Sequence, residues 1–400
     1  MSRLPIARLS IPVFLFNSIL TGTQASASDS EAPPENAPTG DPVVQAAPPP
    51  ADKWEIAHFG VVRAGYDSVS EDSRYDFIGR NNGFALHNAR IGLFGGNAAH
   101  RLSYELSIEG AVDYQEHVNT PQGELDVRLR EAYVRYDPVP WAGLQLGQFK
   151  APLAGEELRD YRDLMFPSRA VAQEGIPVGR GFQERGIAVD RQVGLMLSPS
   201  LPIFLGPFGV RYYGMIMNGN GANQLLDDNG KPGLVARVEL LHGRNVKIGG
   251  AVLKNERTVG QLPNLYTEKD TGFAADAEVR FRGLHAFGQL AKVKTSFPTV
   301  GADDRTQEGF HVEVGYRLQL GPLPLTPAYR FARFHPWAGA FNPANGVNYD
   351  AFRLDYHTLG LRIEHSRLPM SGYLAYTITS EPEPRDLKNN YLQVLGQVIW

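Results

Sequence analysis

Strict alternation of apolar and polar side chains limits what this chain can fold into more than any other feature. In the run 101–114, leucine, tyrosine and isoleucine share one parity, whereas serine and glutamate occupy the other. The runs 270–282 and 305–319 repeat the pattern. Successive side chains of a β-strand point to opposite faces, so a period of two with one apolar face predicts strands rather than helices.

Sixteen such runs follow one another from Trp54 to the C-terminus. The predicted strands cover residues 55–66, 84–95, 101–114, 128–138, 141–150, 184–197, 207–218, 231–242, 245–256, 270–282, 284–296, 305–319, 325–337, 350–365, 368–380 and 389–400. The gaps after most even-numbered strands are tight turns. Most gaps after odd-numbered strands are longer and rich in Asn, Asp, Gly and Pro.

Short turns on one side, long loops on the other and an even strand count are typical of outer-membrane β-barrels. A soluble β-sandwich is the alternative, and it does not predict regular alternation of gap length. The predicted fold class is therefore all-β: a transmembrane antiparallel β-barrel of sixteen strands with a long constriction loop after strand 5. Sixteen strands leave room for a water-filled lumen.

The N-terminal residues have the composition of an export signal. Arg3 and Arg8 precede a short apolar stretch at 9–20, and small residues at 25–27 provide a cleavage site. The predicted organisation is a signal peptide at 1–27, a Pro/Ala-rich periplasmic linker at 28–53 and an outer-membrane barrel at 54–400. A buried N-terminal helix is the alternative for the first segment, and a partner-docking stretch is the alternative for the linker.

Several kinds of chemistry lack the residues that they need. The chain has no cysteine, which excludes disulfides and thiolate chemistry. Its ten histidines show no HExxH or other metal spacing, and no GxSxG motif or phosphate-binding loop occurs. A formal net charge of −4 without a basic cluster argues against nucleic acid as a partner. The sequence predicts neither an enzyme nor a cofactor or metal site.

The aromatic residues and the C-terminus also fit a barrel. In the predicted topology Trp54, Trp141 and Trp400 lie at the periplasmic interface, where an aromatic girdle is expected. The final run 389–400 alternates and ends on an aromatic residue. Such a terminal strand is similar to an outer-membrane insertion signal, which predicts the barrel-assembly machinery as a transient partner.

The longest interruption of the strand pattern is the stretch 151–183, which we expect to fold inward and to limit what passes through the barrel. Guanidinium groups match phosphate and carboxylate oxygens, and rings of cations select anions in pores. The predicted constriction and anion-binding residues are Lys150, Arg159, Arg162, Arg169, Arg180, Arg185 and Arg135.

Acidic residues leave the role of these cations open. The stretch 151–183 also contains five acids, namely Glu156, Glu157, Asp160, Asp163 and Glu174. The alternative interpretation is that most of the arginines form salt bridges that brace the loop against the wall.

One predicted strand has a conflicting pattern. In 350–365, Arg353, Asp355 and His357 share the parity of three apolar residues that follow, Leu359, Leu361 and Ile363. A β-bulge near Thr358 would place the charged group inside and the apolar group outside.

Several segments together resemble the phosphate-selective porin O and P family. They are ARIGLFGG at 89–96, LREAYVRYDP at 129–138, LQLGQFKAPLAGEEL at 144–158, FPSRA at 166–170 and NGNGAN at 218–223. The likeness extends over 54–400. It implies a sixteen-stranded, trimeric channel with a loop folded into the lumen and basic residues at the constriction that favour anions.

The expected function is that of a porin in the outer membrane of a Gram-negative bacterium, through which small hydrophilic solutes diffuse passively, with anion or phosphate selectivity implied by the resemblance. One alternative is a structural or adhesive barrel with a plugged lumen. Another is a barrel enzyme such as a lipase, for which no Ser–His spacing is present. The expected partners are outer-membrane lipid, the barrel-assembly machinery, small anions or other hydrophilic solutes, and further copies of the chain in a homotrimer.

Overall fold

The computed structural model describes most of the chain after its N-terminal stretch. The described residues are 52–110, 127–177, 179–300, 302–338, 341–342, 347–383 and 385–400. The chain divides into two compact units, residues 1–49 and 50–400, and all described residues lie in the second. The predicted signal peptide lies outside the described residues, as does the predicted linker apart from Asp52 and Lys53. Both therefore stay predictions.

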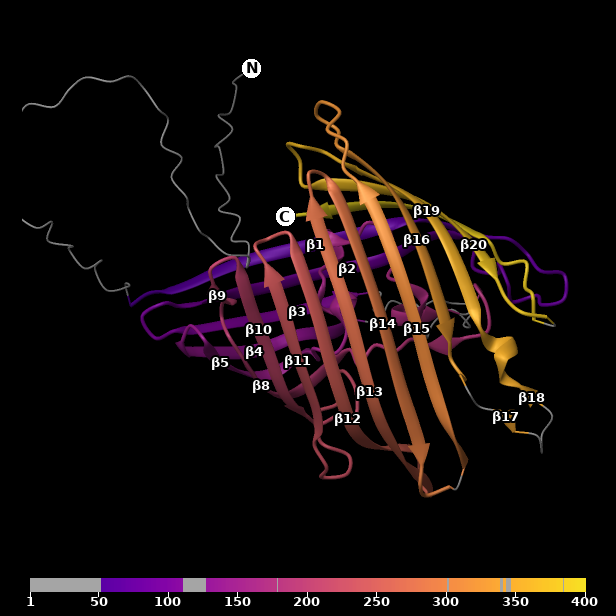
Figure 1. Ribbon diagram of the computed structural model, residues 1–400, viewed down its shortest axis with the longest axis horizontal. Coiled ribbons are helices and arrows are strands. Elements are labelled where there is room, and N and C mark those ends of the chain that lie inside the picture. Colours follow the sequence, from indigo (N-terminus) through magenta and orange to yellow (C-terminus); the bar gives the residue numbers. More distant parts are fainter. Residues whose placement is uncertain are drawn as a thin grey trace, which may run out of the picture. The chain divides into compact units, whose positions relative to one another are not determined.

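Sixteen long strands run through the described residues (Figure 1). They are β1 (Trp54–Val69), β2 (Gly83–Asn97), β3 (Leu102–Gly110), β4 (Val127–Val139), β5 (Ala142–Lys150), β8 (Arg191–Ser198), β10 (Phe208–Met217), β11 (Gly233–His242), β12 (Val246–Gln261), β13 (Asn264–Phe281), β14 (Leu284–Phe297), β15 (Ala302–Tyr316), β16 (Leu325–His335), β19 (Leu354–Glu364), β20 (Met370–Ser380) and β21 (Tyr391–Ile399). Each corresponds to one of the sixteen predicted strands.

The long strands form one closed sheet. Consecutive strands pair antiparallel in chain order, and β1 also pairs with β21, from Val61 opposite Ile399 to Val69 opposite Tyr391. The short strand β9 (Ile203–Leu205) pairs with the first residues of β10, and β8 pairs with the last residues of β10. The prediction of a sixteen-stranded antiparallel barrel is confirmed.

The remaining elements are short. They are the helices α2 (Gly155–Leu158), η1 (Tyr161–Asp163), α3 (Val171–Glu174) and η2 (Tyr349–Phe352), and the paired strands β6 (Gly175–Ile176) with β7 (Glu184–Arg185) and β17 (Phe341–Asn342) with β18 (Val347–Asn348). Within the described parts of the chain, no helix combines the length and the apolar character needed to cross a membrane.

The two faces of the sheet have opposite polarity. Large apolar side chains at alternate positions are exposed, among them Leu93, Leu106, Leu146, Val238, Val252, Leu290, Val312, Leu359 and Val394. Buried side chains of the other parity are largely polar, among them Asn88, Glu109, Gln145, Glu239, Asp276, Gln289, Glu313, Thr358 and Gln393. Apolar residues outside and polar residues inside are what a barrel needs when lipid surrounds it and water enters it.

Exposed aromatic residues gather at the end of the barrel that has the short turns. Trp54 begins β1, Trp141 lies in the turn between β4 and β5, and Trp400 follows β21. Further exposed aromatic residues at this end are Tyr136, Phe208, Phe281 and Tyr316. A belt of this kind fits the boundary between lipid and water.

Three predicted strands have clearly different bounds in the structure. The sixth begins at Arg191 rather than at residue 184, because Glu184 and Arg185 pair with Gly175 and Ile176 in a separate small sheet. The ninth and tenth are longer than predicted and meet in a hairpin, so the predicted loop 257–269 is wrong. Its charged residues form cross-strand pairs, such as Arg257 with Glu268 at 2.6 Å, and this polar stretch hid the strand pattern.

The predicted bulge near Thr358 is also wrong. β19 pairs with β16 and with β20 in continuous register. Thr358 is buried, whereas Asp355 and His357 are on the outward parity together with Leu359. Asp355 pairs there with Arg333 at 2.6 Å, so a charged residue can occupy the outer face near the end of a strand without a change of register.

Candidate pore constriction

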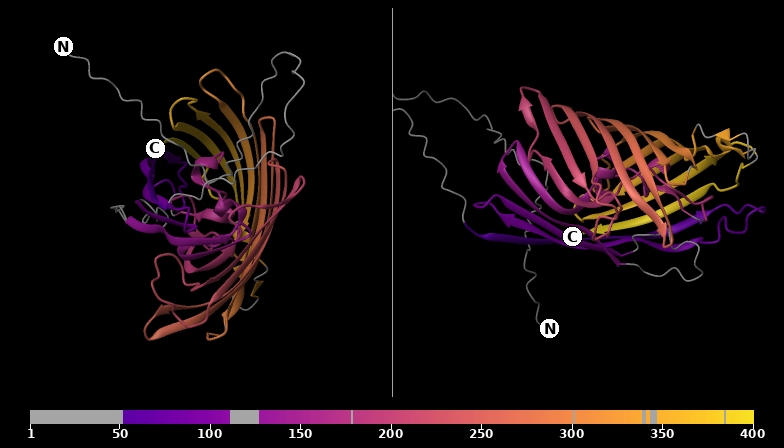
Figure 2. Two further views of the ribbon diagram at one scale, coloured as in Figure 1. Left: turned by 90° about the vertical axis from the view of Figure 1, so that its left-hand side faces the viewer. Right: turned by 90° about the horizontal axis from the view of Figure 1, so that it is seen from below.

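Residues 151–190, called the inward segment below, connect β5 to β8 and lie within the curve of the strands (Figure 2). The two ends of the segment meet, because the amide of Ala151 donates a hydrogen bond to the carbonyl of Asp190 at 3.0 Å. Ala151, Leu153 and Ala154 have no accessible surface, and Phe166 has 1%. The segment is therefore packed against the wall rather than suspended in solvent.

The segment contacts the wall through backbone as well as side chains. On α2, the amide of Glu156 donates a hydrogen bond to Oε1 of Gln289 on β14, 2.8 Å away. Two wall glycines leave room for apolar side chains of the segment. A Cβ atom would lie 2.7 Å from the Phe166 ring if added to Gly360, and 2.7 Å from Sδ of Met165 if added to Gly315. Both glycines thus allow the close approach that these positions require.

Four wall arginines donate hydrogen bonds to carbonyl oxygens of the inward segment. Arg237 binds that of Leu153 at 3.3 Å, and Arg362 binds that of Leu164 at 3.1 Å. Arg330 binds that of Ser168 at 2.9 Å, and Arg63 binds that of Pro167. These arginines come from β11, β19, β16 and β1, so the segment is held from strands far apart in sequence. None of the four was a predicted site residue, because their carbonyl partners are 84 to 198 residues away.

Two predicted site residues bind the backbone of the inward segment, Lys150 from the end of β5 and Arg169 from the segment itself. Nζ of Lys150 donates to the carbonyls of Glu157 at 2.7 Å and Arg159 at 3.2 Å. Arg169 donates to the carbonyls of Glu156 and Arg159, the latter at 2.7 Å. Because the partners of Arg169 are neutral, these bonds do not cancel its positive charge.

Three other predicted arginines form ion pairs. Nη1 of Arg159 lies 2.6 Å from Oε1 of Glu313, and both side chains are buried. Nη2 of Arg180 lies 3.0 Å from Oδ2 of Asp67. Nε of Arg162 lies 3.1 Å from Oδ1 of Asp160, and 48% of the Arg162 side chain is exposed. These pairs support the alternative interpretation, in which arginines brace the loop.

The charges around Arg162 stabilise one another. Burial opposes ionisation of Asp160, yet the Arg162 guanidinium lowers the pKa of Asp160 to about 2. Burial likewise opposes the charged form of Arg162, but the carboxylates of Asp160, Asp163 and Glu105 raise its pKa. Glu105 lies on β3, so Arg162 on the segment is within electrostatic reach of that wall.

The last two predicted residues have partners elsewhere. Arg135 on β4 pairs with Asp137 at 2.8 Å and binds Oγ of Ser198 at 2.9 Å, close to the short turn between β4 and β5. Arg185 lies on β7, and its side chain is exposed while its carbonyl accepts a hydrogen bond from Gln307. The structure therefore brings together Lys150, Arg159, Arg162 and Arg169, whereas Arg135 lies near the short turn at the other end of β5 and Arg185 lies on β7.

The wall formed by β2–β5 and β8 carries a balanced network. Arg90 pairs with Glu105 at 2.9 Å and with Glu131 at 3.6 Å. Arg191 pairs with the same Glu131 at 2.9 Å, and the hydroxyl of Tyr133 donates to Glu105 at 3.2 Å. Positive and negative groups alternate here, so this wall contributes little net charge.

The balance differs on the inward segment. The guanidinium groups of Arg63, Arg169 and Arg330 make the hydrogen bonds described above to neutral groups, and within the described residues none of these three guanidiniums forms an ion pair. Arg63 and Arg169 lie over the same ring, that of Tyr161, at 4.5 and 5.0 Å from its centroid. An arginine stays charged at any physiological pH, so three positive charges surround residues 161–169. The carboxylate of Glu156 is within electrostatic reach of Arg169 and Arg330, and that of Glu174 is within reach of Arg63.

One acid of the segment is partly neutral at pH 7. Burial, together with the neighbouring Asp190 carboxylate, raises the pKa of Glu157 to about 7. Its Oε2 accepts a hydrogen bond from Gln173 at 3.5 Å. Five acids in the sequence of the loop therefore do not amount to five negative charges.

A buried group of possible metal ligands also lies at this contact. Single ligand atoms of Glu156, His311 and Glu313 lie within 4.8 Å of one another. The predicted absence of a metal site rested on local spacing. His311 and Glu313 follow Glu156 by 155 and 157 residues, so no local sequence motif joins them and only the fold reveals the group.

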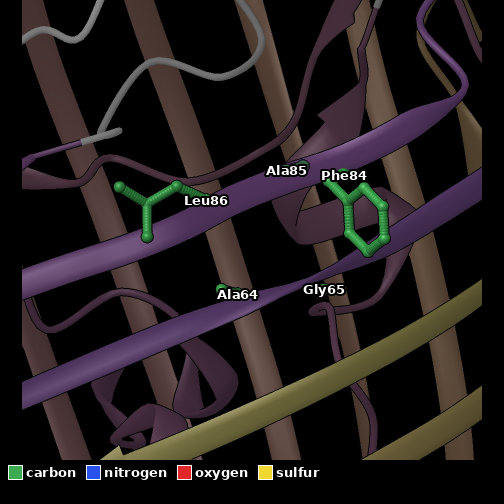
Figure 3. Close-up of a pocket in the computed structure, with 5 residues that line it drawn as sticks. All are labelled: Ala64, Gly65, Phe84, Ala85 and Leu86. Carbon is green, nitrogen blue, oxygen red and sulfur yellow. The ribbon is translucent and has the colours of Figure 1, made fainter.

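An apolar hollow of about 420 Å³ lies on a different face (Figure 3). It is lined by Ala64 and Gly65 of β1 and by Phe84, Ala85 and Leu86 of β2. Phe84 is 93% exposed and shares the outward parity with Leu86. The hollow therefore faces away from the inward segment and has no part in a path through the barrel.

The comparisons with known proteins agree with this geometry. A family model described as phosphate-selective porin O and P matches residues 60–215, which include β2–β5, β8 and the whole inward segment. No curated protein matches the sequence. The resemblance to the porin O and P family is confirmed over the matched residues, and the fold is that of outer-membrane porins.

Solved structures share the fold at low sequence identity. An anion-selective porin from Comamonas acidovorans has 13% identity and a TM-score of 0.58, and the match covers 87% of this chain and 100% of that chain. The outer-membrane channel DcaP of Acinetobacter baumannii has 14% identity and a TM-score of 0.55, with 87% and 97% covered. OmpF of Salmonella typhi has 13% identity and a TM-score of 0.57, with 86% and 97% covered.

Proposed function

We propose that the protein is an outer-membrane channel for passive diffusion of small hydrophilic solutes, that the inward segment forms its constriction, and that the constriction favours anions. The observation that carries the anion preference is the set of three arginines, Arg63, Arg169 and Arg330, whose partners are neutral. Cations that line a pore lower the energy of an entering anion and raise that of a cation.

The wall pairs support the same proposal. Arg90, Arg191, Glu105 and Glu131 balance one another, so they do not offset the charge of Arg63, Arg169 and Arg330. The side chain of Arg162 is 48% exposed, and its partner Asp160 neutralises it. The preference for anions therefore depends on Arg63, Arg169 and Arg330 acting through the field in the lumen.

Single-channel conductance of the refolded protein in a planar bilayer tests the channel and its constriction. Deletion of residues 156–180 removes the inner part of the segment, and we expect the conductance to rise. Correct folding of both proteins is checked by heat-modifiable migration on gels. An unchanged conductance in a folded deletion variant would remove the segment from the role of constriction.

A barrel with a plugged lumen is the second candidate, and the tight packing of the segment favours it. Leu153, Phe166 and Ala170 are almost inaccessible, as they would be in a plug. A folded protein that carries no current would support this candidate over the channel. The exposed pair of Arg162 and Asp160 favours the channel, because part of the segment remains in contact with solvent.

Location and assembly follow from the proposed function. The signal peptide at 1–27 would direct export, the linker at 28–53 would lie in the periplasm, and outer-membrane lipid would contact the apolar outer face. Insertion by the barrel-assembly machinery would use the final strand. The trimer form of OmpT from Vibrio cholerae, with 9% identity, a TM-score of 0.55 and 87% and 100% covered, supports a homotrimer. Phosphate is the solute that the family match suggests.

A further inference from the structure

A buried group of three side chains joins the inward segment to the barrel wall. Glu156 lies on α2, and His311 and Glu313 lie on β15 with one residue between them. Their side chains retain between 0 and 2% of their accessible surface. One ligand atom from each lies within 4.8 Å of the other two. Carboxylate oxygens and an imidazole are a common ligand set for divalent transition metals.

Within the described residues, three atoms of this group have no hydrogen-bond partner. They are Oε2 of Glu156 and both ring nitrogens of His311. A buried polar atom without a partner costs about 1–3 kcal/mol, so a cluster of them indicates that a partner is missing. The distance between Nε2 of His311 and Oε2 of Glu156 is 3.7 Å. This is too long for a hydrogen bond but close to the ~3.3 Å that separates two ligands of one tetrahedral zinc ion.

We propose that Glu156, His311 and Glu313 bind one divalent first-row transition-metal ion such as zinc. The imidazole favours zinc, cobalt or nickel over magnesium and calcium, which prefer oxygen ligands alone. With three protein ligands, the fourth position of a tetrahedral ion is left for water.

Neighbouring groups orient both carboxylates toward this position. Oε1 of Glu156 accepts a hydrogen bond from the amide of Ala170 at 3.0 Å, which leaves Oε2 for the ion. Oε1 of Glu313 accepts from Arg159 at 2.6 Å. The ring of Phe287 packs against that of His311 at 5.5 Å between centroids. Supporting contacts of this kind fix the orientation of metal ligands in proteins.

An ion at this position would tie the segment to the wall. Glu156 belongs to the segment and the other two ligands belong to β15, so displacement of α2 would break the coordination. Arg169 and Arg330 also lie within electrostatic reach of Glu156. The competing arrangement without a metal is a protonated His311 that pairs with Glu156, and the experiment below distinguishes the two.

Cobalt(II) is the probe, because a tetrahedral cobalt site has a strong visible absorption that a surface site with mostly water ligands lacks. The untagged full-length protein is refolded with cobalt, since the group is buried in the folded barrel, and loosely bound ion is then removed. We expect one retained cobalt per chain with the tetrahedral spectrum. The variants Glu156→Gln and His311→Gln should lose both the ion and the spectrum, whereas His242→Gln, which changes an exposed histidine on β11, should keep them.

The proposal would be overturned by the wild-type protein alone if it retained no cobalt or showed only an octahedral spectrum. Retention by folded His311→Gln at the wild-type level would also overturn it. A second readout is the temperature at which the heat-modifiable band converts. Refolding with zinc should raise this temperature in wild-type protein and leave it unchanged in His311→Gln, and equal shifts in both would contradict the site.

Discussion

Nη1 of Arg330 on β16 donates a hydrogen bond to the carbonyl oxygen of Ser168, 2.9 Å away and 162 residues earlier in the chain. The same guanidinium lies 4.5 Å from the centre of the Phe166 ring. Arg63 on β1 binds the preceding carbonyl, that of Pro167. Two cations from different strands therefore hold adjacent peptides of the inward segment, and they both anchor it and give it positive charge.

Arg330→Met should weaken the anchor and the selectivity together. The carbonyl of Ser168 would lose its donor, which is expected to lower the free energy of unfolding by about 1–3 kcal/mol. The reversal potential in a potassium chloride gradient should move toward zero. Arg330→Lys keeps the charge and is the control, with most of the selectivity retained. Equal reversal potentials for wild type and Arg330→Met would show that this charge does not act on permeating ions.

Arg169 and Arg159 should differ although they lie ten residues apart on the same segment. Arg169 binds carbonyls, whereas Arg159 forms a buried ion pair with Glu313 at 2.6 Å. Arg169→Met should therefore reduce anion preference in the bilayer. Arg159→Met leaves a buried carboxylate alone and should destabilise the protein by about 3–5 kcal/mol. The double variant Arg159→Met with Glu313→Gln should recover part of that loss, and additive losses would contradict the pairing.

Rising pH should loosen the inward segment through Glu157. Its pKa in the folded protein is about 7, well above its usual range, so the folded state favours the protonated form. The stabilisation is fully present below the unfolded pKa of about 4.3 and is lost as pH rises through about 7. Amide hydrogen exchange in α2, corrected for intrinsic rates, should therefore be faster at pH 8 than at pH 5. Glu157→Gln should remove this difference, and a persistent difference would assign it to another group.

Gly360→Ala should displace Phe166 from the wall. The added Cβ would lie 2.7 Å from the Phe166 ring, a contact that requires one of the two to move. Overpacking of this kind is expected to cost about 1–3 kcal/mol of stability, measured by urea unfolding in lipid vesicles. Gly372→Ala on the neighbouring β20 is the matched control, since its added Cβ would have its nearest neighbour at 3.9 Å. A similar loss in both variants would point to strand propensity instead of packing.

The strands could be predicted from the sequence because their signal is local. Side-chain parity is set within a few residues, and sixteen runs gave the sixteen long strands. The pattern failed where charged residues lie on the outer face or pair across a hairpin, as Asp355 does with Arg333 and Arg257 does with Glu268. Paired charges near strand ends remain compatible with a strand, and parity alone does not show the pairing.

The contacts of the inward segment could not be predicted, because their partners are distant in sequence. The sequence indicated the position of the segment and the arginines within it, but not that Arg159 would meet Glu313 or that Arg330 would bind Ser168. The distinction between paired and unpaired arginines depends on these contacts. His311 gave no local signal either, since its nearest acidic partner on the segment is Glu156.

The reversal potential of the refolded wild-type protein under a potassium chloride gradient, repeated with added phosphate, tests most directly whether the constriction favours anions. The three arginines with neutral partners predict a potential on the chloride side of zero and a reduced current when phosphate is present. A potential at zero or on the potassium side, in protein that conducts and is correctly folded, would contradict an anion-favouring constriction.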